Sequence, residues 1–291
     1  MTSASATADS IRHAEDLTRR HDENFPVLFR LLPRDSRRHM NVVYAVCRTI
    51  DDIGDDSPGT PEDRLRALDA FAADLERCWG GVPEHPVLVA LSETVREVGL
   101  SPDPLRRLIT ANRWDQERSR WESYPDLLDY CRHSATPVGE MVLAVLGISD
   151  EHSVALSDET CIGLQLVNFW QDIRRDLDEN DRIYLPLRDM EAFGVTEADI
   201  AEPTASPAVR ELIAFETDRA RTHLMAGAPL AARVPRRARL DIRMFTAAGL
   251  ALCDAIAAEG FDTLARRPAP GRRGRLAIAG RVLTNLVRRG R

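Results

Sequence analysis

Four aspartates crowd the end of a predicted helix in the stretch YAVCRTIDDIGDD, residues 44–56. Like charges one helical turn apart repel each other, at a cost of about 0.2–0.5 kcal/mol per pair on an exposed helix. An α-helix places four of these side chains within an arc of about 60°: Tyr44, Arg48, Asp51 and Asp55. The pattern favours a divalent cation bound by Asp51 and Asp55. Asp52 and Asp56 flank this face and are expected to support it or to face solvent.

A second polar stripe follows the predicted helix LQLVNFWQDIRRDLDE, residues 164–179. Four polar side chains share an arc of about 80° on it: Gln165, Asn168, Asp172 and Asp176. The other side of the helix is apolar, and buried carboxylates without partners are costly. We therefore expect the stripe to line a cavity. Its oxygen ligands suit Mg²⁺, which binds one or two carboxylates together with water and phosphate oxygens.

The two acidic stripes have a simpler interpretation that must be weighed. In a chain with 46 acidic residues, a single DxxxD pair is typical of a solvated helix face. Two such pairs, one of them on an apolar helix, favour a magnesium-diphosphate site instead. Magnesium between the stripes would hold a diphosphate and stabilise its charge as it departs. Arg48 and Arg182 could add bidentate contacts to phosphate.

The elements that must position these residues are helices. Apolar residues recur every three or four positions along most of the chain, and Pro and Gly fall between these segments. No alternating strand pattern, GxGxxG motif or Walker sequence is present. The sequence predicts one all-α domain over residues 11–265, preceded by a disordered N-terminus at 1–10. Residues 137–146 are almost uncharged and are expected to be buried in the middle of a bundle.

Composition and charge indicate the cellular location of the chain and the kinds of partner and metal site to expect. The 291 residues include no apolar run long enough to span a membrane and no signal-peptide pattern, and the five cysteines are scattered. The cysteine pattern therefore does not predict a structural zinc site. It predicts a location in the reducing environment of the cytoplasm. No nucleic acid and no obligate protein partner is inferred.

The C-terminal tail has the opposite charge to the rest of the chain. Residues 266–291 carry nine arginines and no acidic residue, whereas residues 1–265 carry 30 arginines against all 46 acidic residues. The tail could form an amphipathic helix that contacts the inner face of the cell membrane. The alternative is a solvated tail.

Four segments together resemble the successive signatures of the squalene/phytoene synthases. They are YAVCRTIDDIGD, YCRHSATPVGEMVL, LQLVNFWQDIRRDL and DRIYLP, in the family's order and spacing over about residues 15–265. The resemblance implies the isoprenoid synthase fold, which is an all-α helical bundle around a central cavity. It also implies a polyprenyl diphosphate substrate and Mg²⁺ held by two facing aspartate-rich helices.

The same resemblance assigns roles to individual residues. The metal ligands it implies are Asp51, Asp55, Asn168, Asp172 and Asp176. Gln165 lies one turn above the second motif, and Arg48, Arg182 and Tyr184 match neighbours of the diphosphate. Tyr130 matches a tyrosine implicated in acid–base work and in stabilising a cation.

A finer resemblance is to the hydroxysqualene synthases of the bacterial hopanoid pathway. It is carried by ENFPVLFRLLP (23–33), SATPVG (134–139) and NFWQD (168–172). This branch ionises presqualene diphosphate, and water captures the rearranged cation to give hydroxysqualene. Two departures from the general family pattern agree with it: Asn24-Phe25-Pro26 replaces a serine-bearing stretch, and Ala135-Thr136-Pro137 replaces Ala-Gly. Both argue against joining two farnesyl diphosphates.

Aromatic and hydroxyl groups would steer the cation. Aromatic faces stabilise cations, and the candidates are Tyr44, Phe25, Phe169 and Tyr130. Tyr130 shares a predicted helical face with Ser134 and Pro137, so two hydroxyls could position the capturing water. The alternative for Tyr130 is a core tyrosine with a satisfied hydroxyl.

Three other functions stay open on the sequence. One is a condensing synthase of the same family, which would make presqualene diphosphate, dehydrosqualene, squalene or phytoene. Another is an all-α nucleotide pyrophosphatase, which also pairs acidic helices with magnesium. The third is a non-catalytic helical binding protein, which leaves the carboxylates unexplained.

Overall fold

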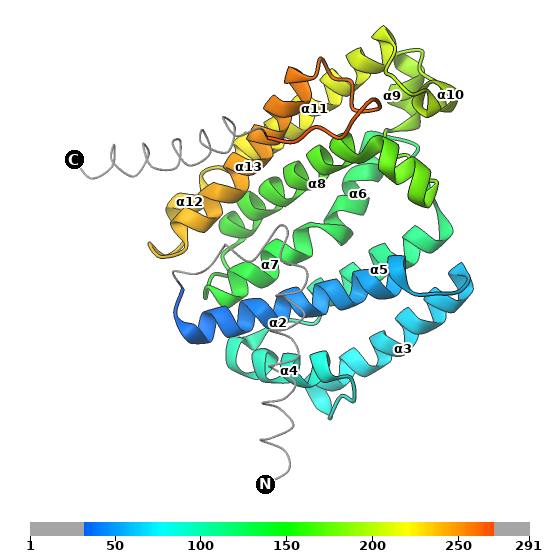
Figure 1. The fold of residues 1–291 in the computed structure, drawn as a ribbon. Coiled ribbons are helices and arrows are strands. Elements are labelled where there is room, and N and C mark those ends of the chain that lie inside the picture. Colours follow the sequence, from blue (N-terminus) through cyan, green and yellow to red (C-terminus); the bar gives the residue numbers. More distant parts are fainter. Residues whose placement is uncertain (1–31, 271–291) are drawn as a thin grey trace, which may run out of the picture. The chain divides into compact units, whose positions relative to one another are not determined.

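The computed structural model describes residues 32–270, and these are mostly helical (Figure 1). Within this range there is no strand, only an isolated bridge between Arg120 and Ile183. The all-α prediction is confirmed. The predictions for residues 1–10, for Phe25 and its neighbours, and for the tail beyond residue 270 lie outside the described residues.

The described helices include two short π-helical turns, labelled η. In chain order they are α2 (Arg34–Asp51), η1 (Asp52–Asp56), α3 (Pro61–Gly80), α4 (Pro86–Thr94), η2 (Val95–Gly99), α5 (Asp103–Glu117), α6 (Tyr124–Ser134), α7 (Thr136–Val145), α8 (Glu151–Asn180), α9 (Leu187–Ala192), α10 (Glu197–Ala201), α11 (Pro207–Gly227), α12 (Leu230–Arg233) and α13 (Arg239–Ala258).

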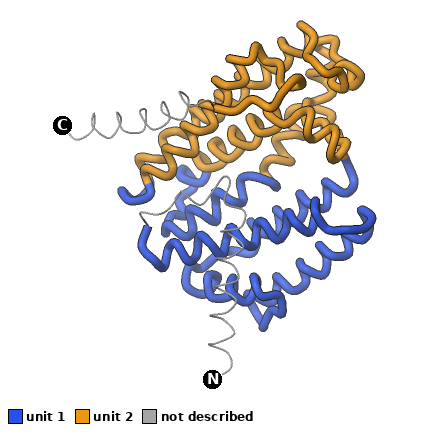
Figure 2. Tube along the Cα trace, in the orientation of Figure 1, with its two compact units in different colours: residues 1–118, 133–154, 234–238 blue, residues 119–132, 155–233, 239–291 orange. Residues whose placement is uncertain are grey.

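The described chain groups into two compact units (Figure 2). The first unit comprises residues 32–118, 133–154 and 234–238, and the second comprises 119–132, 155–233 and 239–270. The first acidic motif belongs to the first unit and the second motif to the second. The domain boundaries expected from the sequence stay a prediction.

The first unit is held together by α2, α3, α4, α5 and α7. Helix α2 packs against α4, α5 and α7, and α3 packs against α4 and α5. Val46, Ile50, Leu68, Leu91 and Ile109 are among its buried side chains. Each such side chain stabilises the fold by about 1.5–3 kcal/mol through the hydrophobic effect. This burial fixes α2 so that Tyr44 and Arg48 stay partly accessible on its other side.

The second unit depends on a close approach of α8 and α11. A Cβ at Gly163 would lie 2.8 Å from the backbone nitrogen of Leu224, and one at Gly227 would lie 2.7 Å from the backbone nitrogen of Thr160. Only glycine allows backbones this close. The buried Trp170 donates its indole N–H to the Glu216 carbonyl at 3.0 Å. These contacts set the rotation of α8 and therefore the direction of its polar stripe.

The segment predicted as one helix around Tyr130 is two helices. Helix α6 ends at Ser134, α7 begins at Thr136, and Ala135 lies between them with φ −116°. Pro137 has no N–H to continue α6, whereas the first turn of a new helix accommodates proline. Tyr130 and Ser134 do lie one turn apart on α6. The expectation that Pro137 shares their helical face is wrong.

A buried carboxyl in the second unit makes stability depend on pH. Glu216 is fully buried, and its Oε1 accepts a hydrogen bond from Arg219 at 2.9 Å. Burial raises its pKa to about 8, with Arg219 opposing the rise and Asp189 adding to it. The unfolded chain releases this proton near pH ~4.3. The native state therefore binds more protons between these values, and stability falls as the pH rises through them.

We expect Glu216→Gln to remove this part of the pH dependence. Thermal unfolding should give similar melting temperatures for variant and wild type at pH 4, and a higher one for the variant at pH 9. Glu211→Gln, at an exposed position on α11, is the control and should follow the wild type. Parallel pH profiles for Glu216→Gln and wild type would contradict the prediction.

Candidate active site

The first acidic motif lies at the junction of an α-helix and a π-helix. Helix α2 ends at Asp51, and the next five residues form η1 rather than a further α-helical turn. The N–H of Asp52 donates to the carbonyls of both Arg48 and Thr49. Single π-helical turns are frequent at functional sites. Asp55 therefore follows Asp51 by a widened turn, which the sequence pattern did not predict.

Arg48 holds the two flanking aspartates. Its Nη2 lies 2.7 Å from Asp52 Oδ1 and 2.9 Å from Asp56 Oδ2. Both flanking carboxylates are thus partly neutralised within the motif. A contact between Arg48 and a diphosphate stays a prediction.

Asp51 carries charge that its surroundings disfavour. Asp51 is an exposed residue, yet the protein atoms packed around its carboxyl desolvate it and raise its pKa to about 7, and repulsion from Asp55 adds to the rise. The amide of Asn112 and the guanidinium of Arg48 oppose it. A cation bound to Asp51 and Asp55 would relieve this unfavourable charge.

The second acidic motif occupies the accessible side of α8. Asn168 is exposed, and Gln165, Asp172 and Asp176 are half-buried. Burial raises the pKa of Asp176 to about 7, and repulsion from Asp172 adds to the rise, with Arg182 opposing it. Arg182 is buried, and its backbone N–H donates to the Asp176 carbonyl at 3.0 Å. This motif also has an excess of negative charge.

Arg267 already supplies a positive charge to this motif. Its Nε and Nη2 donate to the two carboxylate oxygens of Asp172, the Nη2 bond being 3.0 Å long. Nη2 also donates to the Oε1 of Gln171 at 3.0 Å, and Gln171 donates in turn to the Pro268 carbonyl. Arg267 was assigned to the basic tail, and nothing in the sequence pattern places it beside Asp172.

We expect Arg267→Gln to bind Mn²⁺ about two- to five-fold more tightly than the wild type without substrate. An ion pair at a side chain as exposed as Arg267 contributes about 0.2–1 kcal/mol, and the metal must break it. Paramagnetic relaxation of water by free Mn²⁺ measures the affinity. Arg266→Gln is the matched control because Arg266 pairs with Glu259. Equal affinities of Arg267→Gln and Arg266→Gln would contradict the prediction.

A stack of aromatic rings lies in the second unit. The rings of Phe169 and Tyr184 are nearly parallel, with their centroids 3.7 Å apart. The ring of Trp121 also stacks against that of Tyr184, at 4.4 Å between centroids. Tyr130 lies 5.0 Å from Trp121 in an edge contact. All four rings are buried. Aromatic rings can stabilise a carbocation, and that role for these residues stays a prediction.

Trp121 is the member of this stack that sequence reasoning missed. It stands in an irregular segment before α6, where no helical periodicity points to it. Backbone bonds place it: the Ile183 N–H donates to the Ser119 carbonyl at 3.0 Å, and the Leu187 N–H donates to the Trp121 carbonyl at 2.9 Å. These bonds bring two distant segments of the chain, and thereby Trp121 and Tyr184, together.

Ser134 presents a shielded hydroxyl at the end of α6. Its Oγ is shielded from solvent and has no hydrogen-bond partner among the residues that the structure describes. Buried hydroxyls are normally paired with protein or water, so this atom is suited to hold a water molecule. Thr136, which follows the break, accepts a hydrogen bond from Arg107 at 3.1 Å.

The donor set of the two acidic motifs fits magnesium. All five candidate ligands offer oxygen, which is the donor atom that Mg²⁺ prefers. Over residues 32–270, no group of three or more His, Cys, Asp or Glu side chains could hold a metal ion by itself. Mg²⁺ commonly takes few protein ligands and completes its coordination shell with water and phosphate oxygens.

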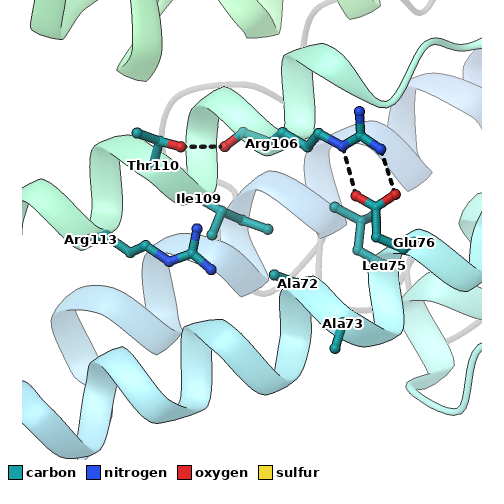
Figure 3. A pocket seen from close by; sticks show the side chains of 8 residues that line it. All are labelled: Ala72, Ala73, Leu75, Glu76, Arg106, Ile109, Thr110 and Arg113. Carbon is teal, nitrogen blue, oxygen red and sulfur yellow. Dashed lines mark hydrogen bonds and ion pairs between the residues drawn. The ribbon is translucent and has the colours of Figure 1, made fainter.

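A groove between α3 and α5 is a different kind of site (Figure 3). Arg106 closes one end through a bidentate pair with Glu76 at 2.6–2.7 Å, and Arg113 pairs with Asp69 at 2.6 Å. Ala72, Ala73 and Leu75 line the rest of the α3 side. No candidate ligand or aromatic residue named above lines this groove, so we do not assign the chemistry to it.

Comparison with known proteins identifies the family. Residues 18–275 match the pattern of the squalene/phytoene synthases. The chain belongs to the squalene/phytoene synthase family. A phytoene synthase of Arthrospira platensis is 32% identical over 76% of this chain and 75% of its own length. A hydroxysqualene synthase of Rhodopseudomonas palustris is 34% identical over 80% of this chain and 76% of its own length.

Solved structures confirm the isoprenoid synthase fold. The squalene synthase HpnC of Alicyclobacillus acidocaldarius superposes with a TM-score of 0.83 at 41% identity, covering 88% of this chain and 95% of its own. A dehydrosqualene synthase gives 0.86 at 21% identity, covering 96% and 97%. Members of this family act on polyprenyl diphosphates. Because the chain belongs to this family of enzymes, the two alternatives of a nucleotide pyrophosphatase and of a non-catalytic binding protein are excluded. None of the helices within residues 32–270 is long and apolar enough to cross a membrane.

Proposed function

We propose that this synthase ionises presqualene diphosphate and captures the rearranged cation with water, giving hydroxysqualene. The observation that carries the proposal is the shielded Ser134 hydroxyl, one turn from Tyr130 on α6. It lies in the SATPVG segment, whose resemblance is to hydroxysqualene synthases. Relatives of that name support the proposal at 34% identity.

The acidic motifs would bind the diphosphate through magnesium. In this proposal Asp51 and Asp55 on α2 and η1 would hold magnesium, as would Asn168, Asp172 and Asp176 on α8. When bound, the metal would supply positive charge that stabilises a departing diphosphate. Arg48, Arg182 and Gln165 donate hydrogen bonds to its oxygens. The raised pKa values of Asp51 and Asp176 support this role, since burial and a neighbouring aspartate disfavour the charged form of each carboxyl.

The aromatic residues would then direct the cation. Phe169, Tyr184 and Tyr130 present π faces that stabilise positive charge, and Tyr44 is a further candidate on α2. Trp121 supports Tyr184 by stacking on it. The hydroxyls of Tyr130 and Ser134 hold the water that attacks, and Tyr130 helps to remove its proton.

Oxygen isotope labelling tests the water capture. We expect the product formed from presqualene diphosphate in H₂¹⁸O to gain one ¹⁸O atom, seen by mass spectrometry. Enzyme treated with a chelator is the control and should give no product. An unlabelled hydrocarbon as the main product would contradict the proposal.

A condensing synthase is the second candidate function. It is favoured by the phytoene synthase of Arthrospira platensis, which matches this chain about as well as the hydroxysqualene synthases do. Such an enzyme would join two prenyl diphosphates and would use the same acidic motifs. The choice of substrate separates the two candidates.

A further inference from the structure

We propose that Asn112 and Gln116 of α5 are positioning residues that hold Asp51 and η1 in the geometry needed to bind magnesium. This inference rests on the proposed role of Asp51 as a magnesium ligand. It assigns a function to two side chains that carry no acid–base or ligand signal in the sequence.

Both side chains reach from α5 to the first acidic motif. The amide of Gln116 donates to the Gly54 carbonyl at 2.9 Å and to the Asn112 carbonyl at 3.2 Å. The amide of Asn112 donates to the Leu108 carbonyl at 3.1 Å and lies 3.5 Å from Asp51 Oδ1. Because the two residues are four apart on α5, they face the same side.

The end of a helix needs such partners. The last four carbonyls of a helix receive no hydrogen bond from an N–H group of that helix, so side chains, water or other groups must donate to them. Gly54 lies two residues before the end of η1, and Gln116 supplies the N–H that its carbonyl lacks. This bond fixes the backbone between Asp51 and Asp55, and so the separation of the two carboxylates.

The contact is so close that a side chain at residue 54 would displace the Asn112 amide. A Cβ at Gly54 would lie 2.2 Å from Asn112 Oδ1 and 3.3 Å from Asn112 Cβ. Gly54 and Asn112 are both buried. The π-helical turn is therefore seated on α5 at one defined position, which a side chain at residue 54 would disturb.

An uncharged donor is the suitable partner for Asp51. The Asn112 amide orients the carboxylate through a hydrogen bond without cancelling its charge. An arginine or lysine there would compete with the metal for the same oxygens. Groups that orient metal ligands in this way typically contribute 10–100-fold to metal affinity.

Metal binding measured without turnover tests the proposal. We expect Asn112→Ala and Gln116→Ala to weaken Mn²⁺ binding about tenfold in the presence of inorganic diphosphate. At saturating Mg²⁺ both variants should regain most of the wild-type kcat, while the Mg²⁺ concentration for half-maximal rate rises. Thr110→Ala, which removes a hydroxyl bonded to the Arg106 carbonyl on the same helix, should change neither quantity.

A double variant separates positioning from packing. Gly54→Ala should lower the melting temperature through the clash with Asn112. Adding Asn112→Ala should restore much of the stability, because the clashing oxygen is gone, and should leave Mn²⁺ affinity low. Wild-type affinity in Asn112→Ala and Gln116→Ala would overturn the positioning role alone. No Mn²⁺ binding by the wild type would overturn it together with the proposed metal site.

Discussion

Asp176→Asn is expected to lower kcat by about 10³-fold and, at the same time, to stabilise the metal-free protein. The loss corresponds to about 4 kcal/mol of transition-state stabilisation, which is within the several kcal/mol that a metal ion supplies to a departing anion. The gain in stability follows from the pKa of Asp176, which burial and Asp172 raise to about 7. In the unfolded chain the same group titrates near pH ~3.9.

The sign of this stability effect depends on pH. Between pH ~4 and 7 the native state keeps a proton that the unfolded chain has lost, so the carboxylate costs more stability as the pH rises. The advantage of Asp176→Asn should therefore grow over this range and level off above pH 7. Thermal unfolding of the metal-free proteins at pH 5 and pH 8 measures it.

Asp178→Asn provides the matched control for this variant. Asp178 is exposed on the same helix and pairs with Arg174 at 2.7 Å, so its loss should leave activity unchanged. Activity of Asp176→Asn within tenfold of the wild type would show that Asp176 does not hold the metal. A drop in stability instead of a rise would show that its carboxylate is satisfied without metal.

Tyr130→Phe is expected to reduce formation of hydroxysqualene by about 10²-fold while diphosphate release continues. General acid–base groups contribute about 10²–10⁴-fold, and phenylalanine keeps the ring that faces Trp121. The cation then has no well-placed water, and elimination to C30 hydrocarbons without a hydroxyl group should replace capture. Chromatography of the products together with a diphosphate assay measures both quantities.

Tyr124→Phe is the control for the loss of a hydroxyl. The Tyr124 hydroxyl is hydrogen-bonded to His223 at 2.8 Å, and the proposal gives it no part in the reaction. The two variants should share at most a small loss of stability, because a buried hydrogen bond contributes about 1 kcal/mol. An unchanged product ratio in Tyr130→Phe would make Tyr130 a core tyrosine, as the alternative interpretation holds.

The helices could be predicted from the sequence, and the π-helical turn at the end of α2 could not. Apolar periodicity identifies α3, α8 and α13 because each buries one side along most of its length. It does not distinguish an α-helix from the π-helical turn η1, since both keep the same residues near one face over five positions. The break at Ala135 could have been predicted from Pro137, which cannot continue α6.

The ligands of the candidate site carry a local signal, whereas their supports do not. Asp51 and Asp172 each belong to a pattern of polar residues that repeats along its own predicted helix. Asn112 lies 61 positions from Asp51, and Arg267 lies 95 positions from Asp172. Such pairs are created only by the packing of distant helices, and an isolated Asn or Arg gives no sign of its partner.

Product analysis with two substrates offered separately tests the central proposal most directly. The enzyme is supplied with Mg²⁺ and no reductant, and receives either presqualene diphosphate or farnesyl diphosphate. We predict hydroxysqualene from presqualene diphosphate and no product from farnesyl diphosphate. Conversion of farnesyl diphosphate to a C30 diphosphate or hydrocarbon would contradict the proposal and identify a condensing synthase.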